Sequence, residues 1–352
     1  MASKILNGLF CLFACPALLL VTHKSLSQNN QIPTHDTTYY ESFQQDIIAR
    51  IYLSQKYTNL ELKKDNGAPR LRYKPNTNLN LGIGATYKNL TINVAYGFGF
   101  LNHDEEKGKA KNLDLQARLY KRIWAIDLYG QFYKDYYEYP KGRGSADNTN
   151  YYIRPDLKVN LIGVAAYKIF NYKRFTLHPA FTQDEVQKIS AGSVLAGAQI
   201  YYGDIKGDSA LVPSQLAIFY DKRFILKVRI LEIGPGVGYA YTQVFPHHFY
   251  FTGSFTLNVN LGLVKETGIT ESFSHVSANA NMLYRLGGGY NNSNWNINAF
   301  WVNTRFAAKG YIAGNSYLMN TGNYRVIFSK RLQAGPKLKK ILRPLDRVLT
   351  VN

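Results

Sequence analysis

The sequence predicts an all-β fold, a transmembrane antiparallel β-barrel of about 12–14 strands. Two observations carry this prediction. Apolar and polar residues alternate with a period of two over about a dozen segments, each of the ~9–11 residues that a tilted strand needs to cross a bilayer. The polar half of the clearest segments also carries no charged residue, although 18% of the whole chain is charged.

Residues 1–27 are expected to be a signal peptide. Lys4 precedes an apolar run from Ile5 to Val21, and small residues lie just before the end of the segment at Ser27. The two cysteines of the chain, Cys11 and Cys15, both fall inside this run. The exported chain is therefore expected to hold neither a disulfide nor a thiolate metal site. After residue 27 no apolar run reaches the ~18 residues of a spanning helix, so strands would have to cross the membrane.

Residues 28–46 are expected to form a periplasmic N-terminal segment. The run "TYYE" at Thr38–Glu41 has capping-box spacing and precedes Phe43 and Ile47, which is typical of a short helix. An extended approach to the first strand fits the same residues equally well. The sequence leaves both forms open.

The barrel is predicted over residues 47–330. Leu79–Tyr87 and Leu90–Phe100 alternate on either side of a short turn and predict a tight hairpin. The clearest single strand is Phe249–Leu261, with phenylalanine, leucine and valine on one face and tyrosine, threonine, serine and asparagine on the other. Further strands are predicted at Ile48–Leu62, Leu113–Tyr120, Trp124–Tyr133, Leu157–Tyr167, Phe175–Phe181, Val194–Tyr202, Lys227–Tyr241, Val276–Leu286, Trp295–Thr304 and Tyr317–Phe328.

The connections alternate in length. Short turns such as Lys121–Arg122 and Pro246–His247 interleave with longer polar loops, which indicates short periplasmic turns and longer extracellular loops. The thirteen candidate strands would leave the C-terminus outside the cell. An even number of strands would return the C-terminus to the periplasm. It therefore requires either that Ile48–Leu62 does not span the membrane or that one more strand lies between Gly203 and Phe224.

The uncharged polar face indicates the surroundings of the sheet. A soluble barrel turns its polar face to water, and that face normally carries Lys and Glu. The polar faces of Asn78–Thr86, Thr91–Gly99 and Tyr250–Asn260 carry neither. We therefore expect these faces to line an enclosed lumen while the apolar faces meet lipid. A secreted soluble β-barrel binding protein is the alternative.

Residues 331–352 are predicted to form a basic periplasmic tail. Leu338, Ile341 and Leu345 recur at helical spacing among lysines and arginines, although Pro344 interrupts the pattern. Such a tail could lie on the inner leaflet, plug the base of the barrel or bind a partner. A solvated basic tail explains the same residues.

The formal net charge of +19 will attract anions. Basic residues outnumber Asp114 and Asp127 at positions predicted to face the lumen, a balance that would favour anionic solutes in a pore. These basic residues are Arg118, Lys158, Lys227, Arg229 and Arg285. The competing account is that surface Lys and Arg bind the phosphates of outer-membrane lipid and lipopolysaccharide. Nucleic acid is not an expected partner, because the chain is exported and its aromatic residues lie in strands rather than beside basic clusters.

One pair of residues has the spacing of a hydrolytic site. His275 and Ser277 lie two apart, on one face of a strand, where an imidazole can assist a hydroxyl nucleophile. The spacing resembles the His-x-Ser of outer-membrane lipid A deacylases, and that resemblance implies a lipid-modifying hydrolase. Asn279 comes one residue late for this pattern, and no Glu follows Ser277 to orient the histidine. We therefore expect no enzymatic activity, no cofactor and no metal.

Four stretches together resemble a family of unknown function. They are "YKPNTNLNLGIGATYKNLTINVAYGF", "SAGSVLAGAQIYY", "GPGVGYAY" and "NTGNYRVIFSKRL". The family consists of exported, predicted outer-membrane β-barrel proteins of Gram-negative bacteria, and the resemblance covers nearly the whole chain after the signal. It implies a barrel, an outer-membrane location and insertion by the barrel-assembly machinery, and it implies no activity. Many such barrels end on an aromatic residue, whereas here Phe328 precedes the basic tail.

The sequence thus predicts an integral outer-membrane barrel, either a small porin-like protein or a structural or envelope-assembly component. A lipid-modifying hydrolase that uses His275 and Ser277 is the second hypothesis.

Overall fold

The computed structural model describes residues 35–43, 45–65, 67–87, 90–98, 104–145, 147, 149–220, 224–312, 314–333 and 335. The predicted signal peptide, nearly all of the predicted tail and the short turn predicted between Leu79–Tyr87 and Leu90–Phe100 lie outside these residues. No helix within the described ranges is long and apolar enough to cross a membrane.

Strands dominate the described chain. They are β1 (Tyr40–Ser42), β2 (Ile47–Lys64), β3 (Leu71–Lys74), β4 (Asn80–Tyr87), β5 (Leu90–Gly97), β6 (Lys111–Tyr120), β7 (Trp124–Tyr139), β8 (Ile153–Ile169), β9 (Glu185–Gln187), β10 (Ala191–Lys206), β11 (Ile225–Val244), β12 (Phe249–Gly268), β13 (Ser272–Asn291), β14 (Trp295–Lys309) and β15 (Asn315–Leu332). The helix α2 (His178–Phe181) and the 3₁₀ turns η1 (Glu105–Lys107) and η2 (Ser214–Tyr220) complete the described elements.

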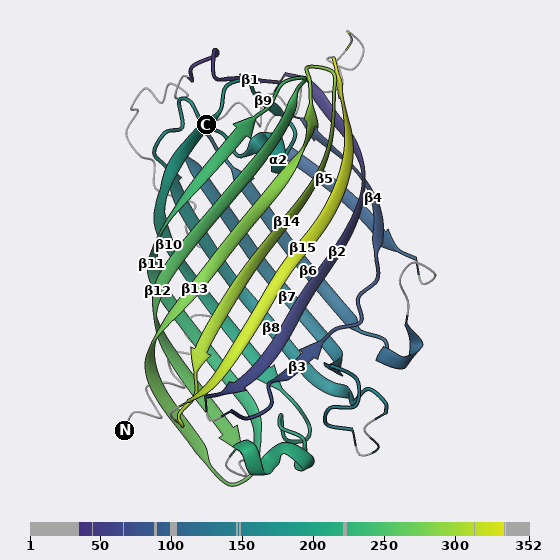
Figure 1. Cartoon of the computed structure of the whole chain (residues 1–352), viewed down its shortest axis with the longest axis vertical. Coiled ribbons are helices and arrows are strands. Elements are labelled where there is room, and N and C mark those ends of the chain that lie inside the picture. Colours follow the sequence, from purple (N-terminus) through teal and green to yellow (C-terminus); the bar gives the residue numbers. More distant parts are fainter. Residues whose placement is uncertain are drawn as a thin grey trace, which may run out of the picture. The chain divides into compact units, whose positions relative to one another are not determined.

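Thirteen of these strands form one antiparallel sheet, and ten of them close into a barrel. The predicted antiparallel barrel is confirmed, but its closed ring holds ten strands instead of about 12–14. The last strand, β15, pairs with β2 along its whole length, so that Leu332 lies opposite Ile47. The short strand β3 completes the ring by pairing with β2 on one side and β7 on the other. We call the end where β2 begins and β15 ends the termini end, at the top of Figure 1, and the opposite end the loop end.

The other three strands widen the wall towards the termini end. The hairpin β4–β5 pairs with the first half of β2, and β6 pairs with β7. No pairing joins β5 to β6 among the described residues. The predicted hairpin is therefore confirmed, but the polar face of β5, including Thr91 and Asn93, stays exposed instead of lining the closed ring.

The alternation in β12 separates the lumen from the outer face as predicted. Thr252, Thr256 and Asn258 are fully buried in the interior, whereas Val259 and Leu261 are each about 60% exposed on the outside. Across strands, the outer face carries rows of aromatic contacts such as Tyr290 on Trp295, with ring centroids 4.5 Å apart. One face is thus polar and enclosed, and the other is apolar and open.

Side chains from opposite walls meet in the middle of the lumen. Tyr129 of β7 contacts Thr304 of β14 through an oxygen–oxygen distance of 3.1 Å. Tyr167 of β8 donates a 2.8 Å hydrogen bond to the side-chain oxygen of Asn258 in β12. The ring of Tyr201 packs on Phe306, with centroids 4.2 Å apart. Tyrosine side chains thus fill the lumen of the barrel and also lie on its outer face.

The loop end is covered by β3 and by the chain that follows β10. The hydroxyl of Tyr73 in β3 donates to the carbonyl of Leu211 at 2.6 Å. Tyr220 in η2 donates to the carbonyls of Leu62 and Pro69 at 3.0 and 2.8 Å. Leu71 and Leu211 are fully buried beneath this cover.

The predicted strand at Phe175–Phe181 is wrong. These residues form a turn followed by α2, with Pro179 near the start of the helix. Proline suits this position because it has no N–H to pair and its φ is already near the helical value. The segment is apolar because it lies inside the barrel, where Phe175 and Leu177 are almost fully buried.

Because Phe175–Phe181 is not a strand, the number of predicted strands falls from thirteen to an even number, twelve. Ile48–Leu62 does lie in a full-length strand, β2, and the described residues between Gly203 and Phe224 contain only the end of β10 and η2 as regular elements. Both of the predicted remedies for the odd count are therefore wrong. The chain needs neither, because the extra candidate is α2.

The N-terminal segment takes the extended form. Asp36 caps a turn through Thr38, and β1 then pairs antiparallel with β9 as a separate two-stranded sheet. The last barrel strand continues to Leu332, two residues beyond the predicted boundary at 330.

Candidate functional site

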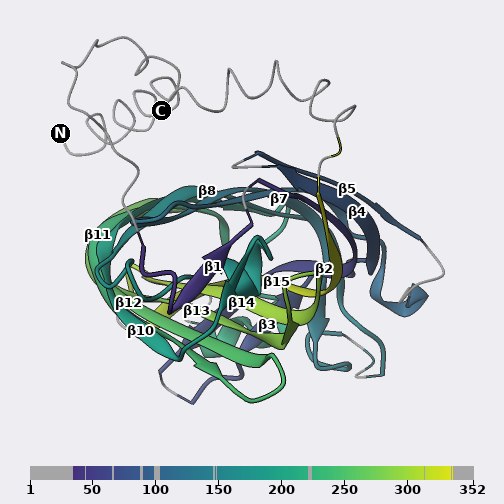
Figure 2. The same ribbon diagram turned by 90° about the horizontal axis from the view of Figure 1, so that it is seen from above.

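Residues 170–190 form the candidate site, a segment between β8 and β10 that closes the termini end of the barrel. We call it the plug. Seen from above in Figure 2, β1 lies within the outline of the ring, and its partner β9 belongs to the plug. In Figure 1, α2 and β9 lie at the same end of the barrel as β1.

Side chains of the wall bind the backbone of the plug. The amide of Asn298 in β14 donates to the carbonyl of Ala180 at 2.6 Å, and the hydroxyl of Tyr250 in β12 donates to that of Pro179 at 2.9 Å. Arg331 in β15 donates to the carbonyl of Gln183 at 2.8 Å, and Arg50 in β2 donates to that of Thr182 at 3.1 Å. These bonds satisfy carbonyl groups that would otherwise be buried without partners.

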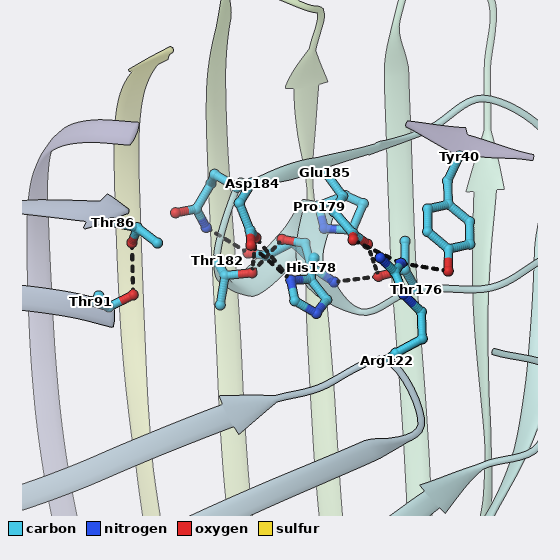
Figure 3. A network of polar contacts seen from close by, with 12 residues as sticks. Tyr40, Thr86, Thr91, Arg122, Thr176, His178, Pro179, Thr182, Asp184 and Glu185 are labelled. Carbon is cyan, nitrogen blue, oxygen red and sulfur yellow. Dashed lines mark hydrogen bonds and ion pairs between the residues drawn. The ribbon is translucent and has the colours of Figure 1, made fainter. Parts of the chain in front are cut away.

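A histidine and a carboxylate form the centre of the plug. The Nδ1 atom of His178 lies 2.9 Å from Oδ1 of Asp184, whose carboxylate also accepts a short hydrogen bond from the hydroxyl of Thr182 (Figure 3). Burial by itself would lower the pKa of His178, but the carboxylates of Asp184 and Glu185 outweigh it and raise the pKa to about 9. His178 is therefore protonated at neutral pH and forms an ion pair with Asp184.

A second ion pair ties the N-terminal segment to the plug. The guanidinium of Arg122, in the turn before β7, lies 3.0 Å from the carboxylate of Glu185 and donates to the hydroxyl of Tyr40 at 2.7 Å. The other oxygen of Glu185 accepts a 2.5 Å hydrogen bond from Thr176. Figure 3 shows these groups beside the His178 pair. The segment before the barrel is thus held inside its mouth.

The two ion pairs are suited to holding the plug in place rather than to catalysis. The hydroxyls that contact the two carboxylates, those of Thr176 and Thr182, donate to them and are not activated by the imidazole. The described residues hold no group of three or more His, Cys, Asp or Glu that could bind a metal ion. Its clearest physical effect is to hold the plug in one position.

Two of the predicted lumen residues do face the interior. Arg285 in β13 and Arg118 in β6 both contact Asp127 of β7, Arg285 through a short hydrogen bond and Arg118 at 3.5 Å. Arg285 and Asp127 are fully buried. Asp114, the other predicted lumen acid, accepts a hydrogen bond from Tyr133 and pairs with Lys56. These interior charges are thus largely neutralised by one another.

The other three predicted lumen residues lie on the outer face, so this part of the prediction is wrong. The inner positions of β8 beside Lys158 are Leu157 and Val159, both fully buried, and Val228 takes the inner position between Lys227 and Arg229 in β11. The prediction assumed that the apolar face of every strand meets lipid. That rule fails near the loop end, where apolar side chains face inward and pack against the cover.

The hydrolase candidates share the inner face of β13 near the loop end. Ser277 is buried and donates to the side-chain oxygen of Asn279 at 3.2 Å, and no hydrogen bond joins it to His275. The amide of Asn279 in turn donates to Glu232 of β11 at 2.7 Å. The carboxylate near this pair therefore contacts Asn279 and not the histidine.

Sequence reasoning missed the plug residues His178, Asp184, Glu185 and Arg122. The signal was present in "HPAFTQDE", where a proline and two adjacent acids interrupt the alternation. Such a run is unfavourable for a strand, since Pro cannot donate to a ladder and Asp is depleted in sheets.

The chain is similar to several solved structures at low sequence identity. The outer-membrane protease OmpT of Escherichia coli is 11% identical over 83% of this chain and 98% of its own, with a TM-score of 0.37. The Neisserial surface protein A is 7% identical over 80% and 96%, with a TM-score of 0.22. Ail of Yersinia pestis is 10% identical over 80% and 97%, with a TM-score of 0.20. The barrel is established by its strand pairing rather than by these similarities.

No curated protein matches the chain. A family model described as "Domain of unknown function (DUF4421)" matches residues 34–329, which include every barrel strand from β2 to β14 and most of β15. Since this match covers well over half of the sequence, the chain belongs to the DUF4421 family of unknown function.

Proposed function

We propose that this protein is an integral outer-membrane β-barrel whose lumen is closed, and that it serves as a structural or assembly component of the envelope rather than as a pore. The observation that carries the proposal is the filled interior. Side chains from opposite walls meet across the middle, the plug closes the termini end, and β3 with the chain around η2 covers the loop end.

The outer face supports the membrane location. Apolar side chains on neighbouring strands stay roughly half exposed or more, for example Ile233 and Val237 in β11 and Val259 and Leu261 in β12. A soluble protein rarely exposes a continuous apolar surface of this kind. In a bilayer the same surface is buried in lipid, and closure of the ring leaves β2 and β15 no unpaired edge between them. A secreted soluble barrel is therefore disfavoured.

Orientation follows from the two ends. The outer membrane's barrels have short turns on the periplasmic side and longer loops outside. Longer connections, 140–152 and 207–224, join strands at the loop end, and the turns at 121–123, 245–248 and 292–294 lie at the termini end. We assign the termini end to the periplasm. The plug then lies on the periplasmic side, and it is longer than the short turns that are usual there.

The closed interior separates this proposal from a porin-like role. Plugged barrels of the outer membrane carry loops or a helix in their lumen, and here α2 with its flanking turns takes that place. The interior cations Arg118 and Arg285 are paired with Asp127. Selectivity for anionic solutes would require basic groups that face an open pathway.

A hydrolytic role has less support. His275 and Ser277 lack the hydrogen bond of a base and its nucleophile, and the nearby carboxylate of Glu232 binds asparagines. We therefore propose that the protein is not an enzyme.

Extraction of cell envelopes tests the membrane part of the proposal. Washing with sodium carbonate at high pH removes peripheral and soluble proteins and leaves integral ones in the pellet. We expect the protein to stay with the outer-membrane fraction and to migrate faster on gels before boiling than after, as folded barrels do. Release into the carbonate supernatant would contradict the proposal.

A further inference from the structure

A row of five lysines crosses the outer face of the barrel near the loop end. Backbone pairing places Lys111 opposite Lys134, Lys134 opposite Lys158, Lys158 opposite Lys206, and Lys206 opposite Lys227. The row therefore passes without a break over β6, β7, β8, β10 and β11. We call these five residues the lysine row.

Every member of the row points away from the lumen. The residues next to them in sequence, including Tyr133, Leu157 and Ile205, take the inner positions and are fully or almost fully buried. Since successive residues of a strand face opposite sides, the lysines face outward. Four of the five are exposed and Lys227 is half-buried.

Such a row is unfavourable on its own. Directly opposite residues of an antiparallel pair have Cβ atoms about 5 Å apart, and like charges at this spacing destabilise the sheet. The one ion pair in the row joins Lys227 to Asp204 at 3.0 Å. Asp135 lies near Lys111 and Lys134, but it forms an ion pair with neither of them. Among the described residues, the row therefore holds more positive charge than the protein compensates.

The row lies where the apolar outer face meets the loops. Two residues further towards the termini end, Leu113 of β6 and Phe132 of β7 are exposed, and four residues beyond Lys158, Ile162 of β8 is half exposed. On the other side of the row, β6 and β10 end within a residue of Lys111 and Lys206. Lysines at such a boundary bury their aliphatic stems against apolar neighbours and extend the ammonium group to the headgroup level.

A surface groove of about 310 Å³ lies directly on the row. Lys111, Lys134 and Lys158 line it together with Leu113, Phe132 and Asn160. Basic and apolar side chains thus share one depression. An anion with an attached hydrocarbon chain would satisfy both kinds of lining group, whereas a free anion would satisfy the lysines alone.

We propose that the lysine row binds the phosphate groups of a lipid in the outer leaflet, with the acyl chains of that lipid against the apolar wall below. Phosphate oxygens accept charge-assisted hydrogen bonds from several ammonium groups at once and so remove the repulsion within the row. The inference rests on the membrane location proposed above, and it names the lipid class that this location would bring to the site.

Binding of fluorescent diphosphorylated lipid A to the purified, folded protein in neutral detergent tests the inference. The test variant replaces three exposed members of the row, as Lys134→Gln, Lys158→Gln and Lys206→Gln. The matched control replaces three exposed lysines outside the row, as Lys121→Gln, Lys168→Gln and Lys330→Gln. Folding of each variant is checked by its shift in gel mobility on boiling.

We expect the row variant to bind at least ~10-fold more weakly, because each lysine at an anionic lipid surface contributes roughly a factor of five. The control should bind within twofold of the original protein. Lipid A stripped of its phosphates should bind the original protein as weakly as the row variant binds intact lipid A.

Equal binding by the row variant, or undiminished binding of the dephosphorylated lipid, would overturn the inference. Displacement of the lipid by millimolar inorganic phosphate would assign the row to free anions and would also overturn it. Release of the protein by carbonate would instead contradict the proposed membrane location. The two experiments therefore distinguish failure of the inference from failure of the proposed function.

Discussion

The imidazole of His178 lies 2.9 Å from the carboxylate of Asp184, inside the mouth of a β-barrel and within four residues of the carbonyls that the wall binds. The pair joins the two ends of a short loop, because α2 begins at His178 and β9 begins just after Asp184. A charged pair in this place fixes the shape of the plug, on which closure of the termini end depends.

The first prediction concerns pH. The pKa of His178 is raised to about 9 in the folded protein, from 6.5 in an unfolded chain. The stabilisation from its charge, on the order of 3 kcal/mol, is therefore fully present below about pH 6.5 and is lost as the pH rises through 9. We expect the unfolding temperature, read from gel mobility, to fall between pH 6 and pH 10.

The variant His178→Gln should remove most of this pH dependence and should be less stable at pH 6. His247→Asn is the matched control, since His247 is exposed in a turn with a φ of 61° that asparagine also accepts. An unchanged pH profile in His178→Gln would contradict the assignment.

The buried contact of Arg285 with Asp127 gives a second prediction. Removing one partner of a buried ion pair typically costs 3–5 kcal/mol, because the other charge stays buried. Arg118 remains near Asp127 at 3.5 Å, so we expect Arg285→Met to cost about 3 kcal/mol. Urea titration of the folded protein in detergent measures the loss. Arg305→Met, on the outer face, should leave the midpoint nearly unchanged, and equal effects of both substitutions would count against the buried pair.

The third prediction separates the closed barrel from a hydrolase. Ser277 donates to Asn279 and not to His275, so Ser277→Ala should leave the lipid A of producing cells unchanged. Mass spectrometry of extracted lipid A detects the loss of an acyl chain directly. A profile that changes when the original protein is produced, and reverts with Ser277→Ala, would establish the enzyme.

The fourth prediction uses the repulsion in the lysine row. Lys158 lies between Lys134 and Lys206, so Lys158→Gln should raise the unfolding temperature in neutral detergent at low salt by ~1–2 °C. The gain should disappear at high salt, where exposed charges are screened. Lys168→Gln, at the other end of the same strand, should show neither effect. A destabilised Lys158→Gln would mean that the lysine is held by a partner within the protein.

The sequence was a good guide to the barrel because of one physical rule. A sheet with lipid on one side and an enclosed lumen on the other needs alternation with an uncharged polar half, and β12 shows this pattern from Phe249 to Leu261. Twelve of the thirteen predicted strands overlap strands of the structure. The hairpin β4–β5 and the long first strand β2 were among them.

The same rule explains what could not be predicted. It equates apolar with lipid-facing, and that equation fails wherever the lumen is filled. Phe175–Phe181 is apolar because it lies inside the barrel, and Leu157 and Val159 face inward, which turns Lys158 outward. The His178–Asp184 contact depends on a helix that alternation cannot reveal. Cross-strand register, which aligns the five lysines, appears only once the strands are paired.

Single-channel recording in a planar bilayer tests the central claim most directly. Insertion is first confirmed by the gel mobility of protein recovered from vesicles of the same lipid, and a general porin serves as the positive control in the same chamber. The closed barrel predicts stable insertion without discrete conductance steps. Reproducible steps of constant size from the original protein would show an open pathway through the lumen and would contradict the account.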